Sequence, residues 1–331
     1  MDVLFIGGTG IISTACSTLA VERGINLTLL NRGRSVRPAP PGARLLTADI
    51  KDEEALDRIL AGHRFTAVVD WVAYTPQDVQ RDIRLFRGKT AQYVFISSAS
   101  AYQTPAANLP IRESTPLENR IWEYSRNKIA CEELLIDEYR RSQFPFTIVR
   151  PSHTYDRSYV PVEGGYTVID RMLRGKPVVV HGDGTSIWTL THNADFAKGF
   201  VGLLGNYRAR GEVFHITSDE WLTWNQIYEL LAEAAGVQAE LVHIPSDLIA
   251  AYDRRIGDSL LGDKTHSTIF DNSKIKQVVP DFAATIPFST GAREIIDWHK
   301  ANPESQKIDP AFNEMCDRLI DNYLKAWPTS S

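Results

Sequence analysis

The chain alternates between short apolar runs and longer segments with helical periodicity. Apolar runs recur at residues 3–6, 27–30, 44–46, 67–69, 93–96, 146–149 and 178–180. Helical patterns at 11–23 and 53–60 separate the earlier runs from one another. Strands that alternate with helices are typical of a parallel sheet covered by helices on both faces. The pattern therefore predicts an α/β fold with a doubly wound parallel sheet.

A glycine turn follows the first apolar run and opens the first helical pattern. Gly7, Gly10 and Ser13 have the spacing GxxGxxS, with a small serine where Gly or Ala is usual. Such glycines let the backbone approach a pyrophosphate, whose charge is stabilised by free N–H groups at the helix N-terminus. A strand–helix turn without a ligand is the alternative. The predicted dinucleotide contacts here are Gly7, Thr9, Gly10, Ile11 and Ile12.

The alternation loosens after Pro151, which indicates a second lobe. We expect a dinucleotide-binding domain over residues 1–155 and a mainly substrate-binding lobe over residues 156–331. Segments within 178–217, such as the apolar run at 213–216, are expected to return partly to the sheet. An amphipathic helix over 311–326 should close the second lobe, and it could also form the face of a homodimer.

Composition limits the classes of partner. The 36 basic and 41 acidic residues give a formal charge of −5, so broad attraction to nucleic acid or anionic lipid is not expected. Cys16, Cys131 and Cys316 are far apart and form no metal-binding motif, which favours reduced thiols in a cytoplasmic protein without a metal. No apolar run is long enough for a membrane helix, and the start MDVLFIGGTG lacks a signal-peptide pattern.

The end of the second apolar run bears on the choice of cofactor. A carboxylate there binds the free ribose 2′-hydroxyl of NAD, whereas nearby arginines accommodate the 2′-phosphate of NADP. This chain has Asn31, Arg32, Gly33 and Arg34 at that place. The pattern favours NADP. A solvated basic turn that accepts either cofactor is the alternative, so NAD remains open.

A tyrosine and a lysine form the candidate reaction centre. Tyr124 and Lys128 are four residues apart and share one face of a predicted helix. An ammonium group beside a phenol stabilises the phenolate and lowers the tyrosine pKa, which would let Tyr124 act as an acid or base. A serine after the run 93–96 could hold the substrate oxygen.

Taken in order, Gly7-x-x-Gly10, Ser98 and Tyr124-x-x-x-Lys128 resemble an extended short-chain dehydrogenase/reductase of the epimerase/dehydratase type. The resemblance spans most of the chain and implies a Rossmann domain with a smaller C-terminal lobe. It implies that Tyr124 is the general acid/base, that Lys128 binds the nicotinamide ribose, and that Ser98 orients the reacting oxygen. Ser97 or Ser100 could take the serine's role if the register differs.

Other positions match the family's cofactor and lobe-junction segments. Asp49 with Ile50 resembles the family's adenine-contacting segment, and Val72 with Ala73 resembles the small residues that flank the cofactor. By the same resemblance Pro151 joins the cofactor set. The further matches are Gly182-Asp183-Gly184, His192 and Asp195. We expect His192 to be structural, bonding backbone near the lobe junction.

Two departures from the family pattern narrow the substrate. Ala99 and Ser100 stand where sugar-nucleotide dehydratases carry an Asp-Glu pair, which argues against that elimination. Trp188 stands where many nucleotide-sugar enzymes carry an arginine for the diphosphate, although Arg254, Arg255 or Lys264 could substitute. The predicted substrate contacts are Ser98, Ser100, His153 and Trp188.

The sequence thus predicts an NAD(P)-dependent oxidoreductase or epimerase that acts at a secondary alcohol or carbonyl carbon of a sugar or sugar derivative. The segments 30–33, 70–74 and 266–274 also resemble an atypical branch of the family that includes chloroplast stem-loop RNA-binding proteins. That branch supplies the alternative, a catalytically silent nucleotide-sensing or RNA-binding protein. The retained Ser98, Tyr124 and Lys128 and the acidic charge favour the enzyme.

Overall fold

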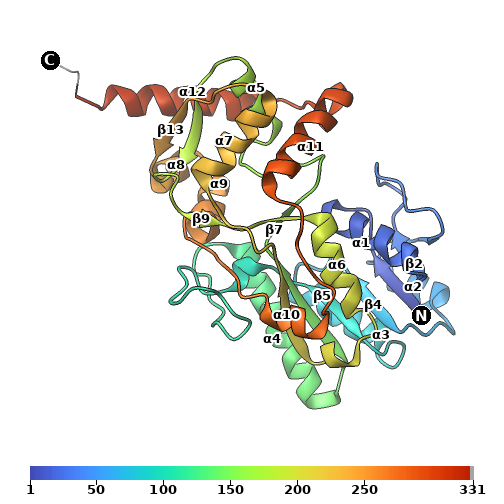
Figure 1. Cartoon of the computed structure of the whole chain (residues 1–331). Coiled ribbons are helices and arrows are strands. Elements are labelled where there is room, and N and C mark those ends of the chain that lie inside the picture. Colours follow the sequence, from blue (N-terminus) through green and yellow to red (C-terminus); the bar gives the residue numbers. More distant parts are fainter. Residues whose placement is uncertain (329–331) are drawn as a thin grey trace.

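A computed structural model describes residues 1–328 and contains a seven-stranded parallel sheet (Figure 1). The strand order is β11-β6-β5-β4-β1-β2-β3, and every neighbouring pair is parallel. The bounds are β1 Asp2–Ile6, β2 Asn26–Asn31, β3 Arg44–Thr47, β4 Ala67–Asp70, β5 Tyr93–Ile96, β6 Phe146–Pro151 and β11 Glu212–Ile216. The order reverses between β1 and β4, and ligands of such sheets bind at the carboxyl ends of the strands beside this switch point.

Helices cover both faces of the sheet, as predicted for a doubly wound fold. On one face lie α1 (Ile11–Glu22), α6 (Asn193–Leu203) and α10 (Ser273–Val278). On the other lie α2 (Glu53–Ile59), α3 (Pro76–Phe86) and α4 (Glu123–Ser142). Val3 and Phe5 join the first core and Leu4 and Ile6 the second. This explains why β1 is apolar throughout instead of alternating with polar residues.

The second lobe packs around its own core at the upper end of the molecule in Figure 1. Its helices are α5 Tyr166–Leu173, α7 Trp224–Ala235, α8 Ser246–Tyr252, α9 Arg254–Ser259, α11 Phe288–Ala301 and α12 Pro310–Lys325. Three strand pairs complete it: β7 His153–Tyr155 with β10 Leu190–His192, β9 Ile187–Trp188 with β12 Leu222–Thr223, and β8 Val178–His181 with β13 Leu241–Ile244. The predicted lobe 156–331 ends in residues that lie outside the described range, namely 329–331.

The sequence pattern located the strands more accurately than it assigned them to a sheet. All seven apolar runs form strands, and the run 213–216 returns to the central sheet beside β6 as expected. The placement of 178–180 in the main sheet was wrong, because β8 pairs with β13 in the second lobe. A buried apolar run looks the same in either sheet, and only the pairing partner distinguishes them.

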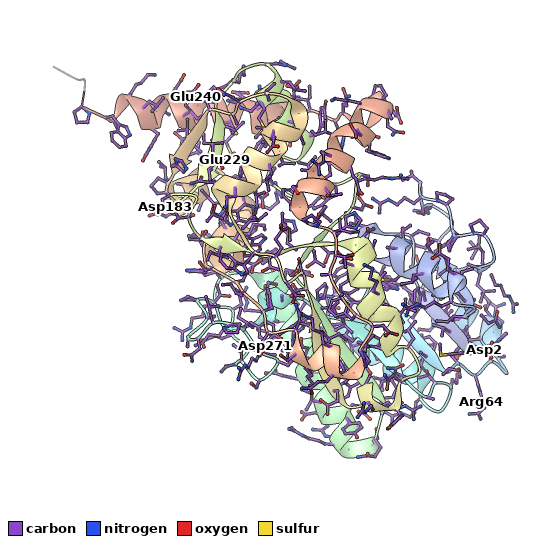
Figure 2. The ribbon with its side chains drawn as sticks, in the orientation of Figure 1. Asp2, Arg64, Asp183, Glu229, Glu240 and Asp271 are labelled. Atoms are coloured by element: carbon purple, nitrogen blue, oxygen red, sulfur yellow. The ribbon has the colours of Figure 1, made fainter. Side chains whose placement is uncertain are left out.

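Two later segments cross back from the second lobe to the sheet. His192 accepts the Ala194 N–H at 3.2 Å and so caps the start of α6, and it contacts Glu294 at 3.0 Å. Before α10, the Asp271 carbonyl lies 2.9 Å from His215 Nε2, and Asp271 lies beside the sheet in Figure 2. These crossings bring second-lobe residues against the carboxyl ends of the strands.

Candidate active site

The glycine turn between β1 and α1 has a backbone that other residues rarely adopt. Gly7 and Gly8 have φ of +93° and +102°. A Cβ at Gly8 would lie 2.7 Å from Leu29 Cδ2, so the turn packs closely on the sheet. Ser13 Oγ accepts the Gly10 N–H at 2.8 Å, which gives the unexpected serine a local function. This tight turn at a helix N-terminus and at the switch point fits a dinucleotide pyrophosphate.

The residues after β2 form a compact basic turn. Asn31 Oδ1 accepts the Gly33 N–H at 3.0 Å, which closes the turn. Arg32 and Arg34 are exposed on it. The turn after β2 therefore places two cations and no carboxylate next to the glycine turn after β1.

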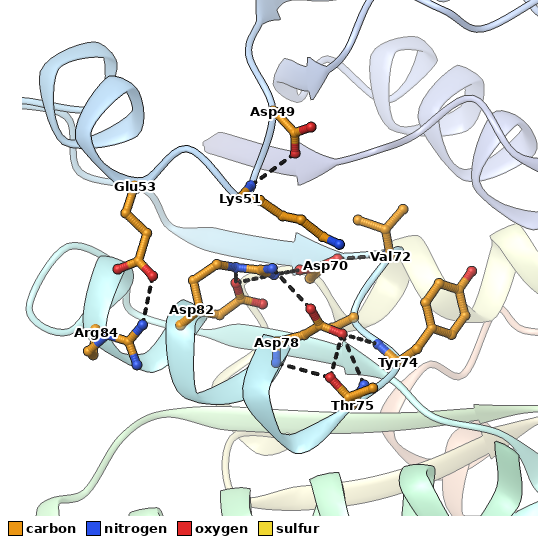
Figure 3. Close-up of polar contacts among 12 residues, drawn as sticks. Asp49, Lys51, Glu53, Asp70, Val72, Tyr74, Thr75, Asp78, Asp82 and Arg84 are labelled. Atoms are coloured by element: carbon orange, nitrogen blue, oxygen red, sulfur yellow. Dashed lines mark hydrogen bonds and ion pairs between the residues drawn. The ribbon is translucent and has the colours of Figure 1, made fainter. Parts of the chain in front are cut away.

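The end of β4 is held by a buried network of charged groups (Figure 3). Asp70 Oδ1 accepts the Val72 N–H at 2.6 Å, and Arg81 Nη2 contacts Asp70 Oδ2 at 3.2 Å. The same guanidinium donates to Asp82 at 2.8 Å, and the Tyr93 hydroxyl donates to Asp82 at 2.6 Å. Burial raises the pKa of the Asp82 carboxyl well above its usual range. The network fixes the loop that presents Val72, a predicted cofactor contact.

Other predicted cofactor residues lie along the same sheet edge. Asp49 Oδ1 accepts the Lys51 N–H at 3.0 Å (Figure 3), and Ile50 packs partly against the core under α2 and α3. Ala73 is buried, and Pro151 lines a cavity together with Ile12 from the first turn of α1. The glycine turn and this cavity are therefore contiguous.

Lys128 lies at the centre of the predicted reaction site. It is 2% exposed, and its Nζ donates to the carbonyls of Ala73 at 2.8 Å and Ile96 at 2.7 Å. The ammonium also lies over three aromatic rings, 4.7 Å from Tyr74, 4.9 Å from Phe95 and 5.7 Å from Tyr124. Backbone from β5 and from the loop after β4 thus fixes the lysine under Tyr124.

The structure distinguishes among the serines after β5. Ser97 is 1% exposed, and its hydroxyl donates to the buried Glu132. Ser98 instead lines the cavity, with its Oγ 2.9 Å from Ser100 Oγ. Ser125 Oγ donates to Ser100 Oγ at 2.7 Å, so Ser100 connects Ser98 to α4. Of the two adjacent serines, only Ser98 faces the cavity with Tyr124.

The pKa of Tyr124 is not lowered, although the sequence predicted that Lys128 would lower it. Burial raises the pKa of Tyr124 to about 12, and the Ser98 hydroxyl opposes this rise. Burial lowers the pKa of Lys128 to about 8. The ammonium bonds two carbonyls and lies 5.7 Å from the centre of the tyrosine ring. Tyr124 is therefore a neutral phenol at pH 7.

A cavity of about 300 Å³ adjoins this centre. Segments from both lobes line it, at Ile12, Ser98–Ser100, Trp122, Tyr124, Pro151–Thr154, Tyr159, Trp188, Thr189, Asp263, Lys264, Thr268 and Phe270. All four predicted substrate residues are in this set. A cavity with apolar walls and a few convergent polar groups is the usual form of a small-molecule site.

His153 and Trp188 form one polar unit of the wall. Trp188 Nε1 donates to His153 Nδ1 at 3.1 Å, and His153 Nε2 lies 3.5 Å from the Tyr159 hydroxyl. Burial lowers the pKa of His153 to about 3, so the ring is neutral at pH 7. Arg254 and Arg255, considered as diphosphate partners, are not among the lining residues, whereas Lys264 is.

The sequence analysis missed Trp122, Asp263 and Phe270. Trp122 precedes α4 and could have been found from its place next to the Tyr–Lys helix. Phe270 lies in the segment 266–274, whose family resemblance pointed to no contact, and Asp263 comes from the turn after α9, which carries no recognisable motif. Only folding of the second lobe onto the sheet edge brings them to the cavity.

Residues 1–328 contain neither a candidate metal site nor a helix that could span a membrane. No cluster of three or more His, Cys, Asp or Glu side chains there has a geometry that could hold a metal ion. In the same range, no helix is long and apolar enough to cross a bilayer.

Similarity to known proteins covers most of the chain. A profile of the NAD dependent epimerase/dehydratase family matches residues 81–217. The 2'-dehydrokanamycin reductase of Streptomyces kanamyceticus is 26% identical over 85% of this chain and 80% of its own length. The chloroplast stem-loop binding protein of 41 kDa b of Arabidopsis thaliana is 28% identical over 73% of this chain and 65% of its own length.

Solved structures share the fold. The UDP-glucose 4-epimerase of Bifidobacterium longum, in complex with NAD+ and UDP, superimposes with a TM-score of 0.74 at 19% identity. The alignment covers 92% of this chain and 100% of that enzyme. The UDP-glucose 4-epimerase of Thermotoga maritima, with UDP-glucose, gives a TM-score of 0.74 at 21% identity, over 92% and 100% of the two chains.

Proposed function

Because this chain is an extended short-chain dehydrogenase/reductase of the epimerase/dehydratase type, we propose that it reduces a carbonyl carbon of a sugar derivative with a nicotinamide cofactor. The observation that carries the proposal is the convergence of Ser98 and Tyr124 on one cavity wall above the buried Lys128. This wall adjoins the glycine turn through Ile12. The same centre also serves the reverse oxidation.

In this mechanism Ser98 and Tyr124 hold the reacting oxygen of the substrate. A bound nicotinamide supplies or accepts the hydride. Tyr124 is a neutral phenol at pH 7, which is the form that donates a proton to a carbonyl oxygen as it becomes a hydroxyl. Lys128 places a positive charge 5.7 Å from the centre of the tyrosine ring. The contact that favours the remaining phenolate is the hydrogen bond with Ser98, which lowers the Tyr124 pKa. Ser100 holds Ser98 in position through their hydroxyl contact.

Replacing Tyr124 tests this role. We expect Tyr124→Phe to lower turnover about 100-fold or more, because general acid catalysis contributes that much. The assay is the change in nicotinamide absorbance with a panel of free and nucleotide-linked keto sugars. Tyr207→Phe is the matched control, since Tyr207 is 76% exposed outside the cavity. Full turnover by Tyr124→Phe, with cofactor still bound, would rule out the mechanism.

We propose NADP as the preferred cofactor, because Arg32 and Arg34 are exposed after β2 with no carboxylate beside them. The double change Arg32→Ala with Arg34→Ala should raise the KM for NADPH about tenfold and leave that for NADH nearly unchanged. Arg44→Ala is the control. Arg44 is also exposed, but it lies at the start of β3, whereas Arg32 and Arg34 follow the end of the parallel strand β2. An equal effect on both cofactors would refute the preference.

Epimerisation is the second candidate, supported by the fold shared with UDP-glucose 4-epimerases. An epimerase reoxidises or rereduces the substrate within one turnover and returns the cofactor unchanged. It would therefore purify with nucleotide bound and act without added cofactor. A reductase would consume added NADPH or NADH in proportion to product.

An RNA-binding function is the remaining alternative, and the relative from Arabidopsis thaliana is named a stem-loop binding protein. Electrostatic RNA binding weakens steeply with salt. Filter binding of a stem-loop RNA at physiological ionic strength, compared with low salt, would reveal it. Salt-sensitive binding together with no turnover of any keto sugar would favour this function over the enzyme.

A further inference from the structure

Asp263 brings a carboxylate to the cavity from the second lobe. It lies in the five-residue π-helical turn Leu260–Lys264 that follows α9, and it lines the same cavity as Trp122 and Tyr124. It is close enough to Tyr124 for its charge to raise the tyrosine pKa. Among residues 1–328, no side-chain or backbone donor bonds the Asp263 carboxylate. Its charge is therefore available to a molecule in the cavity.

The other charged residue of the cavity wall is already neutralised. Lys264 Nζ donates to Ser259 Oγ at 2.6 Å and lies 3.4 Å from Glu163 Oε1. His153 is a neutral ring at pH 7. The Lys264 charge also lowers the Asp263 pKa, but its ammonium is bonded to Ser259 and faces Glu163 and not the Asp263 carboxylate. The lining has no arginine that could bind a diphosphate.

Aromatic rings line the same cavity as this carboxylate. The lining rings are Trp122, Tyr124, Tyr159, Trp188 and Phe270. The faces of such rings attract cations, and Trp122 already lies 5.4 Å from the Lys264 ammonium. Aromatic faces next to a free carboxylate form a cavity that suits a cation and disfavours a phosphate.

We propose that the substrate is a cationic amino sugar or aminocyclitol and that Asp263 binds its protonated amine. This inference rests on the proposed function, since it identifies the substrate class of the same site. Asp263 then binds the substrate, and the residues proposed for the chemical step stay Ser98, Tyr124 and Lys128.

The ionisation of Asp263 is consistent with this role. Burial raises its pKa to about 6, so the carboxyl is mostly ionised at pH 7. An ammonium group bound beside it would favour the charged form further. Without a bound cation, burial disfavours the charged carboxyl, and only the charge of Lys264 opposes this effect. Asp263→Asn should therefore fold at least as stably as the wild type, and a urea unfolding curve checks this.

Ligand-observed NMR titrations of the cofactor-saturated full chain test the proposal. The probes are D-glucosamine, 3-amino-3-deoxy-D-glucose and 2-deoxystreptamine, with D-glucose as the neutral counterpart and UDP-glucose as the anionic one. A charge-assisted hydrogen bond predicts that at least one amine binds about 10-fold or more tightly than D-glucose. UDP-glucose should bind more weakly than that amine.

Two variants assign the preference to one carboxylate. Asp263→Asn should abolish the preference for the amine and retain binding of D-glucose. Asp258→Asn should retain the preference, because Asp258 lies on the adjoining α9 and faces Arg254 at 3.7 Å. No amine preference in the wild type, or an equal preference in Asp263→Asn, would overturn the proposal.

The turnover assay separates this inference from the proposed function. Reduction of a neutral keto sugar that requires Tyr124, without any preference for amines, would overturn only the role of Asp263. Binding of amines through Asp263 without consumption of either nicotinamide cofactor would overturn the reductase and leave the amine site.

Discussion

Lys128 shows how one buried residue links the stability of this protein to its chemistry. A charged side chain that is 2% exposed loses the hydration it has in the unfolded chain. Two backbone carbonyls replace part of that hydration, and the pKa still falls to about 8. The spacing with Tyr124 was readable from the sequence, because i and i+4 residues share a helix face. The carbonyl partners come from β5 and the loop after β4, and they could not be predicted from the sequence.

This burial predicts a pH dependence of stability. Between about pH 8 and pH 10.5 the unfolded chain still binds the lysine proton and the folded chain does not, so the free energy of unfolding rises with pH over that window. Relative to Lys128→Met, the wild type should gain about 2 to 3 kcal/mol between pH 7 and pH 10. Urea unfolding of both proteins at these pH values measures the difference.

Lys300→Met is the control for this measurement, because Lys300 is exposed on α11. Its stability difference from the wild type should not change with pH over the same window. A pH-independent difference for Lys128→Met as well would contradict the lowered lysine pKa.

At the scale of elements, α3 contributes charge to the sheet as well as apolar contacts. Thr75 begins the helix with a capping box that includes Asp78, and Pro76 occupies the first turn. Its inward face also carries Arg81, which contacts Asp70 on β4 and Asp82 beside it (Figure 3). Local pattern marks a charged residue as exposed, so this buried network was not predictable from α3 alone.

Removing the Arg81 guanidinium from this network should lower the free energy of unfolding. Arg81→Met leaves Asp70 and Asp82 buried without their partner, so we expect a loss of about 3 to 5 kcal/mol in the free energy of unfolding. Arg84→Met on the same helix breaks an exposed pair with Glu53 at 2.7 Å and should cost less than about 1 kcal/mol. Chemical unfolding of both variants gives the comparison. Similar losses for the two would show that the network is not stabilising.

At the scale of the molecule, Asn119 joins the two lobes at the cavity. Its Nδ2 donates to the Ser100 carbonyl at 3.2 Å and to the Gly262 carbonyl at 2.6 Å. Its Oδ1 accepts the Trp122 N–H at 2.8 Å. One buried amide thus aligns the serine loop after β5, the start of α4 and the turn that carries Asp263.

Gly262 packs so closely at this junction that there is no room for a side chain. A Cβ there would lie 2.8 Å from Trp122 Cβ and 3.2 Å from Asn119 Oδ1. Gly262→Ala should push the turn away from the sheet, which costs about 1 to 3 kcal/mol of stability. Because Asp263 moves with the turn, the substrate KM should rise and the cofactor Kd should stay unchanged. Steady-state kinetics and cofactor titration test this, and an unchanged KM would show that the turn does not shape the cavity.

The amino-acid pattern was enough to locate the strands of the central sheet, the glycine turn and the Tyr–Lys pair, because each depends on periodicity or backbone geometry within a short window. It located β8 as a strand but not its partner β13. Only the tertiary structure brought Asp263 to the cavity wall that carries Tyr124. It also shows that Ser98, which the family resemblance implied, lines the cavity while Ser97 bonds the buried Glu132. Those results depend on which segments pack together, and the contacts between distant segments leave no periodic signal in either one.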